Sequence, residues 1–208
     1  MSYIPGDLTK YDPTSRLNPK ETALLVVDYQ KFYLEKDQDM YMEHAAKDGP
    51  KLNAFCQAMK DAGCLLIYVQ CSHALMRNNF YTHLYPEQFD ADGTAHLRPG
   101  TRAFEVSDDI TVVPDYYVAK DRWDGFYMTN LELILNNWEI KNVAITGLAT
   151  HTCSLETACS AVFRGYDTTM ITDLNWAVWE PLQNITFESF KGAYGTAMSS
   201  EEYLARLK

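Results

Sequence analysis

The chain has 208 residues, of which 47% are hydrophobic and 22% charged, and its formal net charge at pH 7 is −10. This composition fits one globular domain with a substantial core, and the acidic balance argues against nucleic-acid binding, which requires a basic face. No apolar run reaches the roughly 18 residues of a membrane span, and the stretch MSYIPGDLTKYDP lacks the apolar region of a secretory signal. Five cysteines without a CxxC pair predict reduced thiols and a cytoplasmic location.

The first third of the chain predicts an arm followed by a βαβ unit. Residues 1–20 contain three prolines and little periodicity, which predicts an extended N-terminal arm. The apolar run TALLVVD at 22–28 is typical of a strand buried on both faces of a parallel sheet. Apolar residues at helical spacing over 50–62, closed by Gly63, predict a helix, and CLLIYVQ at 64–70 predicts the next strand.

The middle of the chain is less regular. Residues 72–114 are aromatic, polar and rich in turn residues, which predicts an irregular segment and suggests a lid over a site. The run DYYVAK at 115–120 predicts a short strand that ends on Lys120. The pattern TNLE at 129–132 has the form of a capping box, so we assign Thr129 to the start of a helix.

Regular elements continue toward the C-terminus. Strands are predicted at 142–147 and 167–173, and helices at 153–165 and 181–191. The sequence shows no internal repeat or low-complexity tract. We therefore predict that residues 1–208 form a single α/β domain, a three-layer α/β/α sandwich with a mainly parallel, Rossmann-like sheet.

Reactive side chains stand at the carboxyl ends of these strands, which is where ligands bind in open α/β sheets. Asp28 ends the first strand, Lys120 ends the strand at 115–120, and Cys153 follows the strand at 142–147 through the turn GLATHTC. A thiol at a helix N-terminus beside a lysine is in a setting that lowers its pKa from about 8.5, and the thiolate is the competent nucleophile. Taken singly, each residue has a more ordinary role: Asp28 as a turn residue, Lys120 as a solvated lysine and Cys153 as a small core residue.

Three blocks of sequence occur in order: VVDYQKFY, AKDRWDGFYMTNLELIL and TGLATHTCSLETACSAVFRGYDTTMITD. Together they resemble the isochorismatase-like cysteine hydrolase superfamily, which includes nicotinamidases, N-carbamoylsarcosine amidohydrolases, ureidoacrylate amidohydrolases and biuret hydrolases. The resemblance runs from about residue 21 to about residue 174 and is weakest between 72 and 110. Its third block is the most specific.

The resemblance implies a catalytic triad of Asp28, Lys120 and Cys153. Asp28 is expected to act as general base, Lys120 to hold the carboxylate and thiolate in place, and Cys153 to attack a carbonyl carbon. An amine or ammonia then leaves, and water hydrolyses the thioester. The resemblance also implies a cis peptide bond between Leu148 and Ala149, which would aim the Ala149 N–H, together with the Cys153 N–H, at the developing oxyanion.

Further residues are expected to bind the substrate. The segment RWDGFYMT after Lys120 resembles the corresponding segment of ureidoacrylate- and carbamoyl-type amidohydrolases, which implies an aromatic pocket for a small planar amide. The predicted substrate-binding residues are Gln30, Phe32, Trp123, Phe126, Tyr127, Thr150 and His151. For each of them a role in the core or on the surface is the alternative.

The sequence departs from the nicotinamidase pattern. Nicotinamidases carry an Asp-x-His pattern and a further histidine that bind a metal, whereas this chain reads QCSHALMRNNF, with Cys71 two residues before His73. The expectation is therefore no metal and no cofactor. The vinyl-ether-cleaving isochorismatases lack the nucleophilic cysteine, so the presence of Cys153 argues against that activity as well.

We therefore expect a metal-independent cysteine amidohydrolase that cleaves a C–N bond of a small amide, ureido or carbamoyl compound. The alternatives are a non-catalytic relative that binds a small molecule or a partner, a redox-sensing thiol, and a nicotinamidase. By analogy with the family, the chain is expected to form a homo-oligomer, a dimer or tetramer, with the N-terminal arm as a candidate subunit contact. We expect neither nucleic-acid nor membrane partners.

Overall fold

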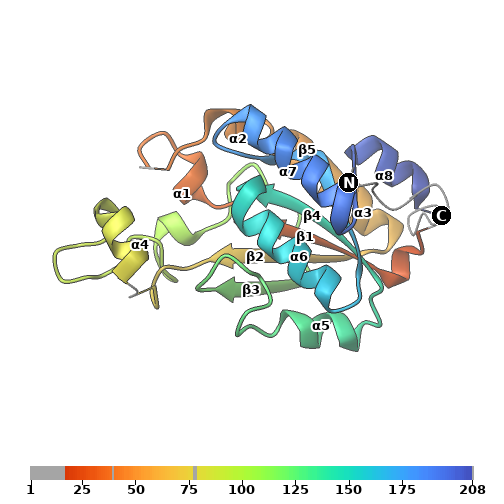
Figure 1. Cartoon of the computed structure of the whole chain (residues 1–208), viewed down its shortest axis with the longest axis horizontal. Coiled ribbons are helices and arrows are strands. Elements are labelled where there is room, and N and C mark those ends of the chain that lie inside the picture. Colours follow the sequence, from red (N-terminus) through yellow and green to blue (C-terminus); the bar gives the residue numbers. More distant parts are fainter. Residues whose placement is uncertain (1–16, 39, 77–78, 208) are drawn as a thin grey trace, which may run out of the picture.

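Within residues 17–38, 40–76 and 79–207, which the computed structural model describes, six parallel strands form the centre of the fold (Figure 1). The strands are β1 (Thr22–Val27), β2 (Leu65–Cys71), β3 (Tyr116–Lys120), β4 (Asn142–Leu148), β5 (Asp167–Trp176) and β6 (Thr196–Met198). Their order across the sheet is β3-β2-β1-β4-β5-β6. The predicted parallel sheet is confirmed, and because β1, β2 and β4 are buried throughout, they read as uninterrupted apolar runs.

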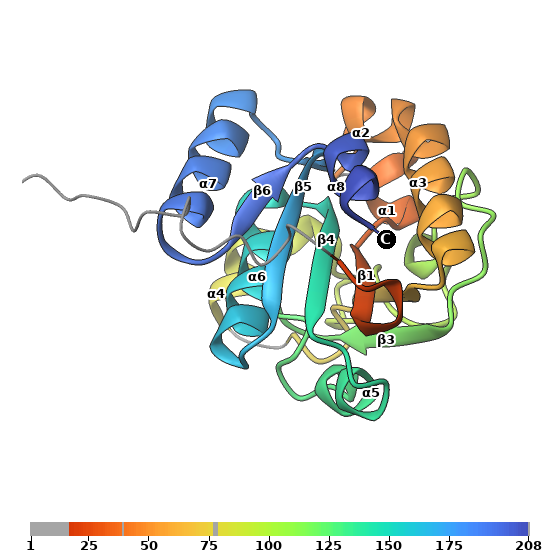
Figure 2. The same cartoon turned by 90° about the vertical axis from the view of Figure 1, so that its right-hand side faces the viewer.

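Helices cover both faces of this sheet, as the predicted three-layer sandwich requires (Figure 2). The helices are α1 (Lys31–Leu34), α2 (Glu43–Lys47), α3 (Gly49–Ala62), α4 (Asn79–Leu84), α5 (Leu131–Asn137), α6 (Leu155–Phe163), α7 (Glu180–Ala193) and α8 (Ser200–Arg206). Successive strand residues point to opposite faces. Leu24 and Val26 therefore pack with α3 and α8, whereas Leu25 and Val27 pack with α5, α6 and α7.

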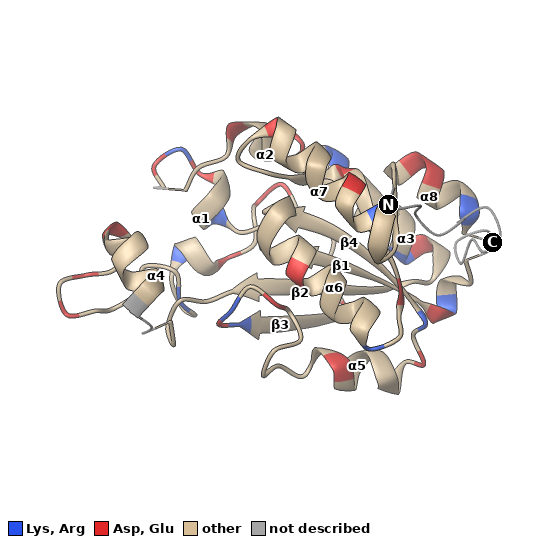
Figure 3. Cartoon of the chain, in the orientation of Figure 1, with Lys and Arg blue, Asp and Glu red and all other residues tan. Residues whose placement is uncertain are grey.

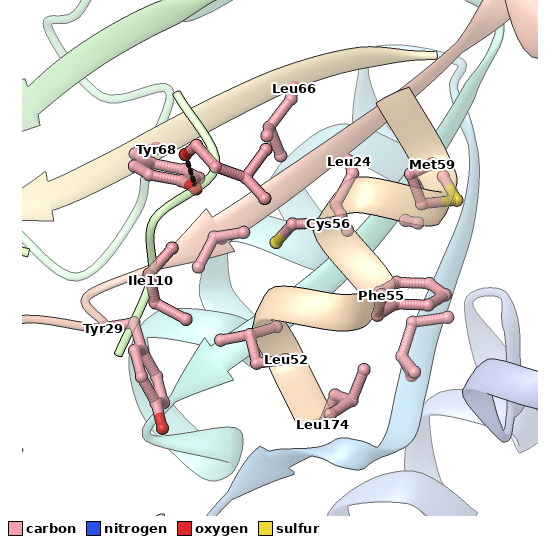
Figure 4. Packing of buried hydrophobic residues seen from close by; sticks show 14 of the residues in the cluster. Leu24, Tyr29, Leu52, Phe55, Cys56, Met59, Leu66, Tyr68, Ile110 and Leu174 are labelled. Atoms are coloured by element: carbon pink, nitrogen blue, oxygen red, sulfur yellow. Dashed lines mark hydrogen bonds between the residues drawn. The ribbon is translucent and has the colours of Figure 1, made fainter. Parts of the chain in front are cut away.

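Helix α3 shows how the apolar spacing builds one of these layers. Figure 4 shows its buried side chains facing the strands, namely Leu52, Phe55, Cys56 and Met59. These positions recur at i, i+3, i+4 and i+7, which places them on one face of a helix. The helix ends where Gly63 adopts a φ of 93°, a left-handed conformation that glycine adopts readily. The predicted helix over 50–62 is confirmed.

Charged residues avoid the central strands. Figure 3 shows Lys, Arg, Asp and Glu on helices and loops, whereas β1, β2 and β4 carry none. This distribution follows from the burial of those strands on both faces, because an unpaired buried charge is costly. In the described part of the chain, no helix combines the length and the apolar character that crossing a membrane requires.

Helix α5 begins differently from the prediction. Its N-cap residue is Asn130, whose side chain makes no capping bond, and the predicted capping box between Thr129 and Glu132 is wrong. The Thr129 hydroxyl instead donates to the carbonyl oxygen of Gly125 at 2.6 Å and accepts from the Leu131 N–H at 3.2 Å. The preceding turn therefore takes the hydroxyl that a capping box would use.

The C-terminal part of the sheet extends beyond the predicted elements. Strand β5 continues past Asp173 to Trp176, and the sequence did not predict β6 or α8. Asp173 accepts hydrogen bonds from the main-chain N–H and the hydroxyl of Ser200, both at 2.7 Å. It therefore supports the start of α8.

Residues 1–16 of the predicted N-terminal arm lie outside the described residues. The part that follows is held to the body: Leu17 is fully buried and pairs in parallel with Leu207. Residues Pro19–Glu21 then form one 3-10 turn that leads into β1. The expectation that the arm contacts another subunit stays a prediction.

The first part of the irregular segment 72–114 lies beyond the carboxyl ends of the strands, where Figure 1 shows α4 past the arrowheads of β2 and β3. Its last part returns to the start of β3, and Ile110 and Val112 pack in the core cluster that contains α3. The segment 72–114 contains α4 and short 3-10 turns at Pro86–Gln88 and Arg102–Phe104. The segment builds a small apolar cluster with the strand ends, whose buried members are Phe32, Cys71, Met76, Tyr81, Leu97 and Ala103. Its position is compatible with the predicted lid, and closure over a site stays a prediction.

Candidate active site

Two of the predicted catalytic residues follow neighbouring strands at the point where the strand order reverses. The chain runs outward from β1 through β2 to β3 and then returns to the other side of β1 as β4. Ligands bind at such a switch point, outside the carboxyl ends of the strands. Asp28 follows β1 and Cys153 follows β4 after a short turn, and Lys120 ends β3 at the same edge.

The structure brings these three side chains into direct contact. The Lys120 ammonium lies 2.8 Å from Asp28 Oδ2, 3.3 Å from Cys153 Sγ and 3.0 Å from the carbonyl oxygen of Arg122. An ammonium has three N–H donors, so each one has an acceptor here. The group is enclosed, since Asp28 is 1% exposed, Lys120 0% and Cys153 7%. A carboxylate, a cation and a thiol thus form one buried unit.

Burial dominates the electrostatics of this unit. It raises the pKa of Asp28, although Lys120 opposes the shift. Burial alone would lower the pKa of Lys120, but the charges of Asp28 and Cys153 hold it well above its ordinary value. Burial, and then the Asp28 carboxylate, raise the pKa of Cys153 well above its ordinary value. The expected lowering of this thiol pKa is therefore wrong, because one lysine does not outweigh burial and a neighbouring carboxylate.

Asp28 occupies an unusual backbone conformation with a φ of 52°, which few non-glycine residues adopt. Its N–H donates to the carbonyl oxygen of Val69 and its own carbonyl accepts from the Gln30 N–H, both at 2.8 Å. Its Oδ1 is buried and, within the described residues, has no hydrogen bond of regular geometry, although the Cys153 thiol and the Cys71 N–H are close enough to lower the pKa of the carboxyl. The turn thus presents one carboxylate oxygen to Lys120 and leaves the other free to accept a proton.

The turn GLATHTC is built without the predicted cis bond. No cis peptide bond occurs among the described residues, so the bond between Leu148 and Ala149 is trans and that prediction is wrong. The chain is redirected one residue earlier, at Gly147, whose φ is 119° and where the register between β4 and β5 shifts. Residues Thr150–Ser154 then form a π-helical turn that carries Cys153, a feature often found at functional sites.

Gly147→Ala should destabilise the fold strongly. An added Cβ would lie 1.9 Å from the carbonyl oxygen of Val27, and we expect about 1–3 kcal/mol each from overpacking and from the strained φ. Gly165→Ala is the matched control, because its φ is also positive, 88°, but nothing lies within 4 Å of its added Cβ. Urea unfolding should show the larger loss for Gly147→Ala. Equal losses in the two variants would contradict the steric argument.

Three of the predicted substrate-binding residues line one cavity of about 460 Å³, namely Trp123, Tyr127 and His151. The lining includes Thr152, the neighbour of Cys153 in the chain, but not Cys153 itself. Arg122, Asp124, Thr152 and Glu156 complete its lining. Phe126 does not reach this cavity: it is buried in the core, where its ring stacks on Tyr166. The sequence pattern could not separate Phe126 from its neighbours, because both core and pocket positions favour aromatic residues.

The other predicted substrate-binding residues are buried. Gln30 is fully enclosed and its carboxamide bonds to main-chain groups of Cys71 and Phe104. Phe32 packs in the apolar cluster under the segment 72–114. Thr150 is fully buried, and its hydroxyl has no hydrogen-bond partner in the described part of the chain. Of these, Thr150 alone keeps a free polar group beside Cys153.

A buried polar network near the site was missed from the sequence. The Tyr81 hydroxyl donates to Gln88 Oε1 at 2.8 Å and lies 3.0 Å from His73 Nε2. The Tyr81 ring also meets Trp123, with ring centroids 6.1 Å apart, so the network reaches the wall of the cavity. These residues come from a segment without periodicity, and only its richness in aromatic side chains hinted at an enclosed site.

Tyr33 was also missed. Burial raises the pKa of its phenol well above the ordinary value, and the nearby charges of Cys71, Asp28 and Cys153 add to the shift. Tyr33 packs against the apolar cluster formed by the segment 72–114. It stands five residues after Asp28 in the block VVDYQKFY, so its place in that block was the available signal.

The His73 imidazole should make stability depend on pH. Burial, aided by Lys120, lowers its pKa from 6.5 to about 4. The unfolded chain therefore binds a proton below pH 6.5 that the folded chain refuses until about pH 4, so acidification through this window costs up to about 3 kcal/mol. His73→Gln should flatten the loss, as measured by urea unfolding at several pH values. An unchanged slope would contradict this assignment.

Among the described residues, no group of three or more His, Cys, Asp or Glu side chains is arranged to hold a metal ion. The buried His73 contacts aromatic rings and the Tyr81 hydroxyl. The structure therefore gives no ligand set from which a metal-dependent step can be built with these residues.

Comparison with known proteins agrees with the fold. Residues 22–202 match the isochorismatase domain family. A probable inactive nicotinamidase from Arabidopsis thaliana is 26% identical, covering 74% of this chain and 80% of that protein. Ureidoacrylate amidohydrolase RutB from Pseudomonas syringae pv. syringae is 29% identical, covering 66% of this chain and 63% of that protein.

Solved structures with the same architecture include two named hydrolases. A cysteine hydrolase from Pseudomonas syringae pv. phaseolicola superposes with a TM-score of 0.81 and 24% identity, covering 91% of this chain and 93% of that chain. N-carbamoylsarcosine amidase from Thermoplasma acidophilum superposes with a TM-score of 0.71 and 25% identity, covering 86% and 95%. The predicted α/β/α architecture is thereby confirmed.

Proposed function

This chain belongs to the isochorismatase family, and we propose that it is a cysteine amidohydrolase that cleaves the C–N bond of a small amide, ureido or carbamoyl compound. The observation that carries the proposal is the contact of Lys120 Nζ with both Asp28 Oδ2 and Cys153 Sγ at the switch point of the sheet. The names of two similar proteins, a ureidoacrylate amidohydrolase and an N-carbamoylsarcosine amidase, support the type of bond.

The proposed reaction begins with the neutral thiol. The Cys153 proton passes to Asp28 as Sγ attacks the substrate carbonyl carbon, and the carbonyl oxygen takes the negative charge. The C–N bond then breaks, and the leaving nitrogen takes the proton from Asp28. Water adds to the thioester with Asp28 again as base, which releases the acid and restores the thiol. The raised pKa of Asp28 suits this role, because a stronger base accepts the proton more readily.

Lys120 is proposed to stay protonated throughout. Its pKa is held well above the ordinary value by Asp28 and Cys153, so it stabilises negative charge on either partner without giving up its proton. The main-chain N–H groups of Ala149 and Cys153 are proposed to stabilise the oxyanion. With the Leu148–Ala149 bond trans, this part of the proposal rests on the position of Ala149 next to the π-helical turn.

The cavity lined by Trp123, Tyr127 and His151 is proposed to hold a small substrate, with its reacting carbon toward Cys153. Its volume of about 460 Å³ and its walls of Trp123 and Tyr127 suit a planar amide stacked against aromatic rings. Thr150 is proposed to bond the substrate, because its buried hydroxyl has no partner among the described residues. His151 offers a second group, since its buried Nδ1 likewise has no partner there.

A second candidate is a relative without catalytic activity, because one similar protein is named a probable inactive nicotinamidase. Such a protein would bind a small amide in the cavity without turning it over. A redox-sensing thiol at Cys153 belongs to the same class of alternative. The intact contacts among Asp28, Lys120 and Cys153 favour the enzyme over both.

Ammonia release from a panel of small amides tests the proposal. The panel comprises nicotinamide, ureidoacrylate, N-carbamoyl amino acids, biuret and maleamate. Acid-quenched enzyme should carry an acyl group on Cys153, located by peptide fragmentation, and none on the half-buried Cys159 of the same peptide. Ammonia release that persists after alkylation of Cys153 would contradict the mechanism. Protection of Cys153 from iodoacetamide without ammonia release would indicate the non-catalytic relative.

A further inference from the structure

At the active site, β2 extends past the end of β1, so the last main-chain groups of β2 have no strand to pair with. In a parallel pair, the N–H and C=O of one residue face the same neighbouring strand, and alternate residues face the other side. Val69 faces β1, because its carbonyl oxygen accepts the Asp28 N–H. Cys71, two residues later, faces the same way, but β1 ends at Val27 and the chain turns away at Asp28 with a φ of 52°.

The side chain of Gln30 takes the place of the missing strand. Its Oε1 accepts from the Cys71 N–H at 2.8 Å, and its Nε2 donates to the Cys71 carbonyl oxygen at 3.1 Å. One carboxamide therefore bonds both main-chain groups of Cys71, which in a continued parallel ladder would bond to two different residues of β1. The second N–H on Nε2 donates to the Phe104 carbonyl oxygen at 2.9 Å. Gln30 is fully buried, and both of its side-chain donors are used within the protein.

The same residue also fixes the turn that carries Asp28. The Gln30 main-chain N–H donates to the Asp28 carbonyl oxygen at 2.8 Å. Gln30 pairs with Val106 in an antiparallel bridge, and the adjacent Lys31 forms ion pairs with Glu105 and Asp108, each at 2.7 Å. The strand end, the turn and the segment 102–108 are thus tied together at one side chain.

We propose that Gln30 is a positioning residue of the active site: its carboxamide replaces the missing strand and holds the left-handed turn that aims Asp28 at Lys120 and Cys153. This inference rests on the proposed function, in which Asp28 is the base. It also replaces the expectation that Gln30 contacts the substrate. Removing the carboxamide leaves both main-chain groups of Cys71 without a buried partner, so the strand end and the turn relax together.

Gln30→Met tests this proposal, with Gln70→Met as the matched control. Gln70 Nε2 donates to the same Phe104 carbonyl oxygen at 2.8 Å, and Gln70 is also buried, so the two variants remove one shared bond by the same chemical change. Gln30→Met should lower kcat by about 10–100-fold with KM within about threefold, because small displacements of a catalytic group cost that much. Gln70→Met should keep kcat within about twofold.

Alkylation of Cys153 by iodoacetamide supplies a readout without substrate. The titratable groups around this thiol are Asp28, Lys120 and Cys71. Asp28 opposes ionisation and Lys120 favours it, whereas Cys71 stays neutral because burial raises its pKa to about 12. When Asp28 moves away, the thiolate loses a repulsion and keeps its lysine, so the midpoint of alkylation should shift to lower pH in Gln30→Met. Gln70→Met should keep the wild-type midpoint. General loosening of the fold would also ease ionisation, because it would expose the buried thiol. The limiting alkylation rate of the ionised thiol at high pH separates the two causes: loosening would raise it, whereas in Gln30→Met it should equal the rate in Gln70→Met.

Gln30→Glu is the second variant in case Gln30→Met does not fold. It keeps the size of the side chain and the acceptor for the Cys71 N–H, but as a carboxylate it cannot donate to Cys71 or Phe104, so kcat should again fall. A folded Gln30 variant with kcat and alkylation midpoint equal to those of Gln70→Met overturns the inference. If wild-type protein releases no ammonia from any amide, the proposed function fails instead, and the alkylation midpoint still decides the role of Gln30.

Discussion

Replacing Cys153 with alanine should reduce ammonia release from the best amide of the panel to the rate in buffer, a loss of at least about 10⁴-fold. No other thiol among the described residues contacts Lys120 at hydrogen-bond distance, so none replaces the nucleophile. The ion pair between Lys120 and Asp28, 2.8 Å long, does not need the sulfur. The variant should therefore stay folded while turnover disappears.

Cys159→Ala is the control for this prediction. Cys159 lies on α6, the helix that follows the π-helical turn, and is half-buried, but the proposed mechanism gives it no role. Its replacement should leave turnover within about twofold of wild type. Cys153→Ala that retains even a tenth of wild-type turnover would show that another group attacks the carbonyl. In that case, the contact between Lys120 and Cys153 would not mark the nucleophile.

The central strands and the meeting of the catalytic groups were predictable from sequence for physical reasons. A strand buried on both faces accommodates few polar residues, so β1, β2 and β4 appear as mainly apolar runs with clear ends. Parallel strands place their carboxyl ends at one edge, so Asp28, Lys120 and Cys153 could be expected together before any distance was known. The short β6 has no comparable signal, because its burial depends on contacts with distant parts of the chain. The start of α8 did carry a signal, the capping box of Ser199 and Glu202.

The local geometry of the site and the pKa values of its groups were harder to predict from the sequence. The shape of the turn before Cys153 depends on how closely Gly147 approaches Val27, which involves two strands and not one motif. The pKa of Cys153 depends on total burial, which a position at a helix N-terminus does not reveal. Gln30 illustrates the same limit: a glutamine after Asp28 looked available to a substrate, whereas its partners lie 41 and 74 positions away in the sequence.

Lys120→Met should abolish activity and also destabilise the fold. Lys120 and Asp28 are 0% and 1% exposed in their side chains, and breaking a buried pair leaves one charge without compensation, at a cost of about 3–5 kcal/mol. Turnover should fall by about 10³-fold or more, because no cation then stabilises the thiolate or holds the base. Thermal unfolding and ammonia release measure the two losses independently.

The pH dependence of the Lys120→Met variant identifies the cause of its instability. Burial already raises the pKa of Asp28 from 3.8, and without the lysine its main opposing charge is gone. The folded variant therefore keeps a proton on this carboxyl that the unfolded chain releases. A raised pKa in the folded state means that the stability is fully present below pH 3.8 and is lost as the pH rises through the folded value. Lys120→Met should therefore lose stability on going from acid toward neutral pH, relative to wild type.

Lys31→Met is the matched control for this last prediction. The Lys31 side chain is 5% exposed, but its partners Glu105 and Asp108 are 58% and 75% exposed. Its removal leaves two solvated carboxylates, so the lost pairing should cost about 1 kcal/mol or less. Lys31→Met should not show the loss of stability between acid and neutral pH that is expected for Lys120→Met. The double variant Asp28→Asn/Lys120→Met should recover stability but not activity, because the buried charge is gone and so is the base. Recovery of activity in the double variant, or equal losses for Lys31→Met and Lys120→Met, would show that the buried pair does not organise the site.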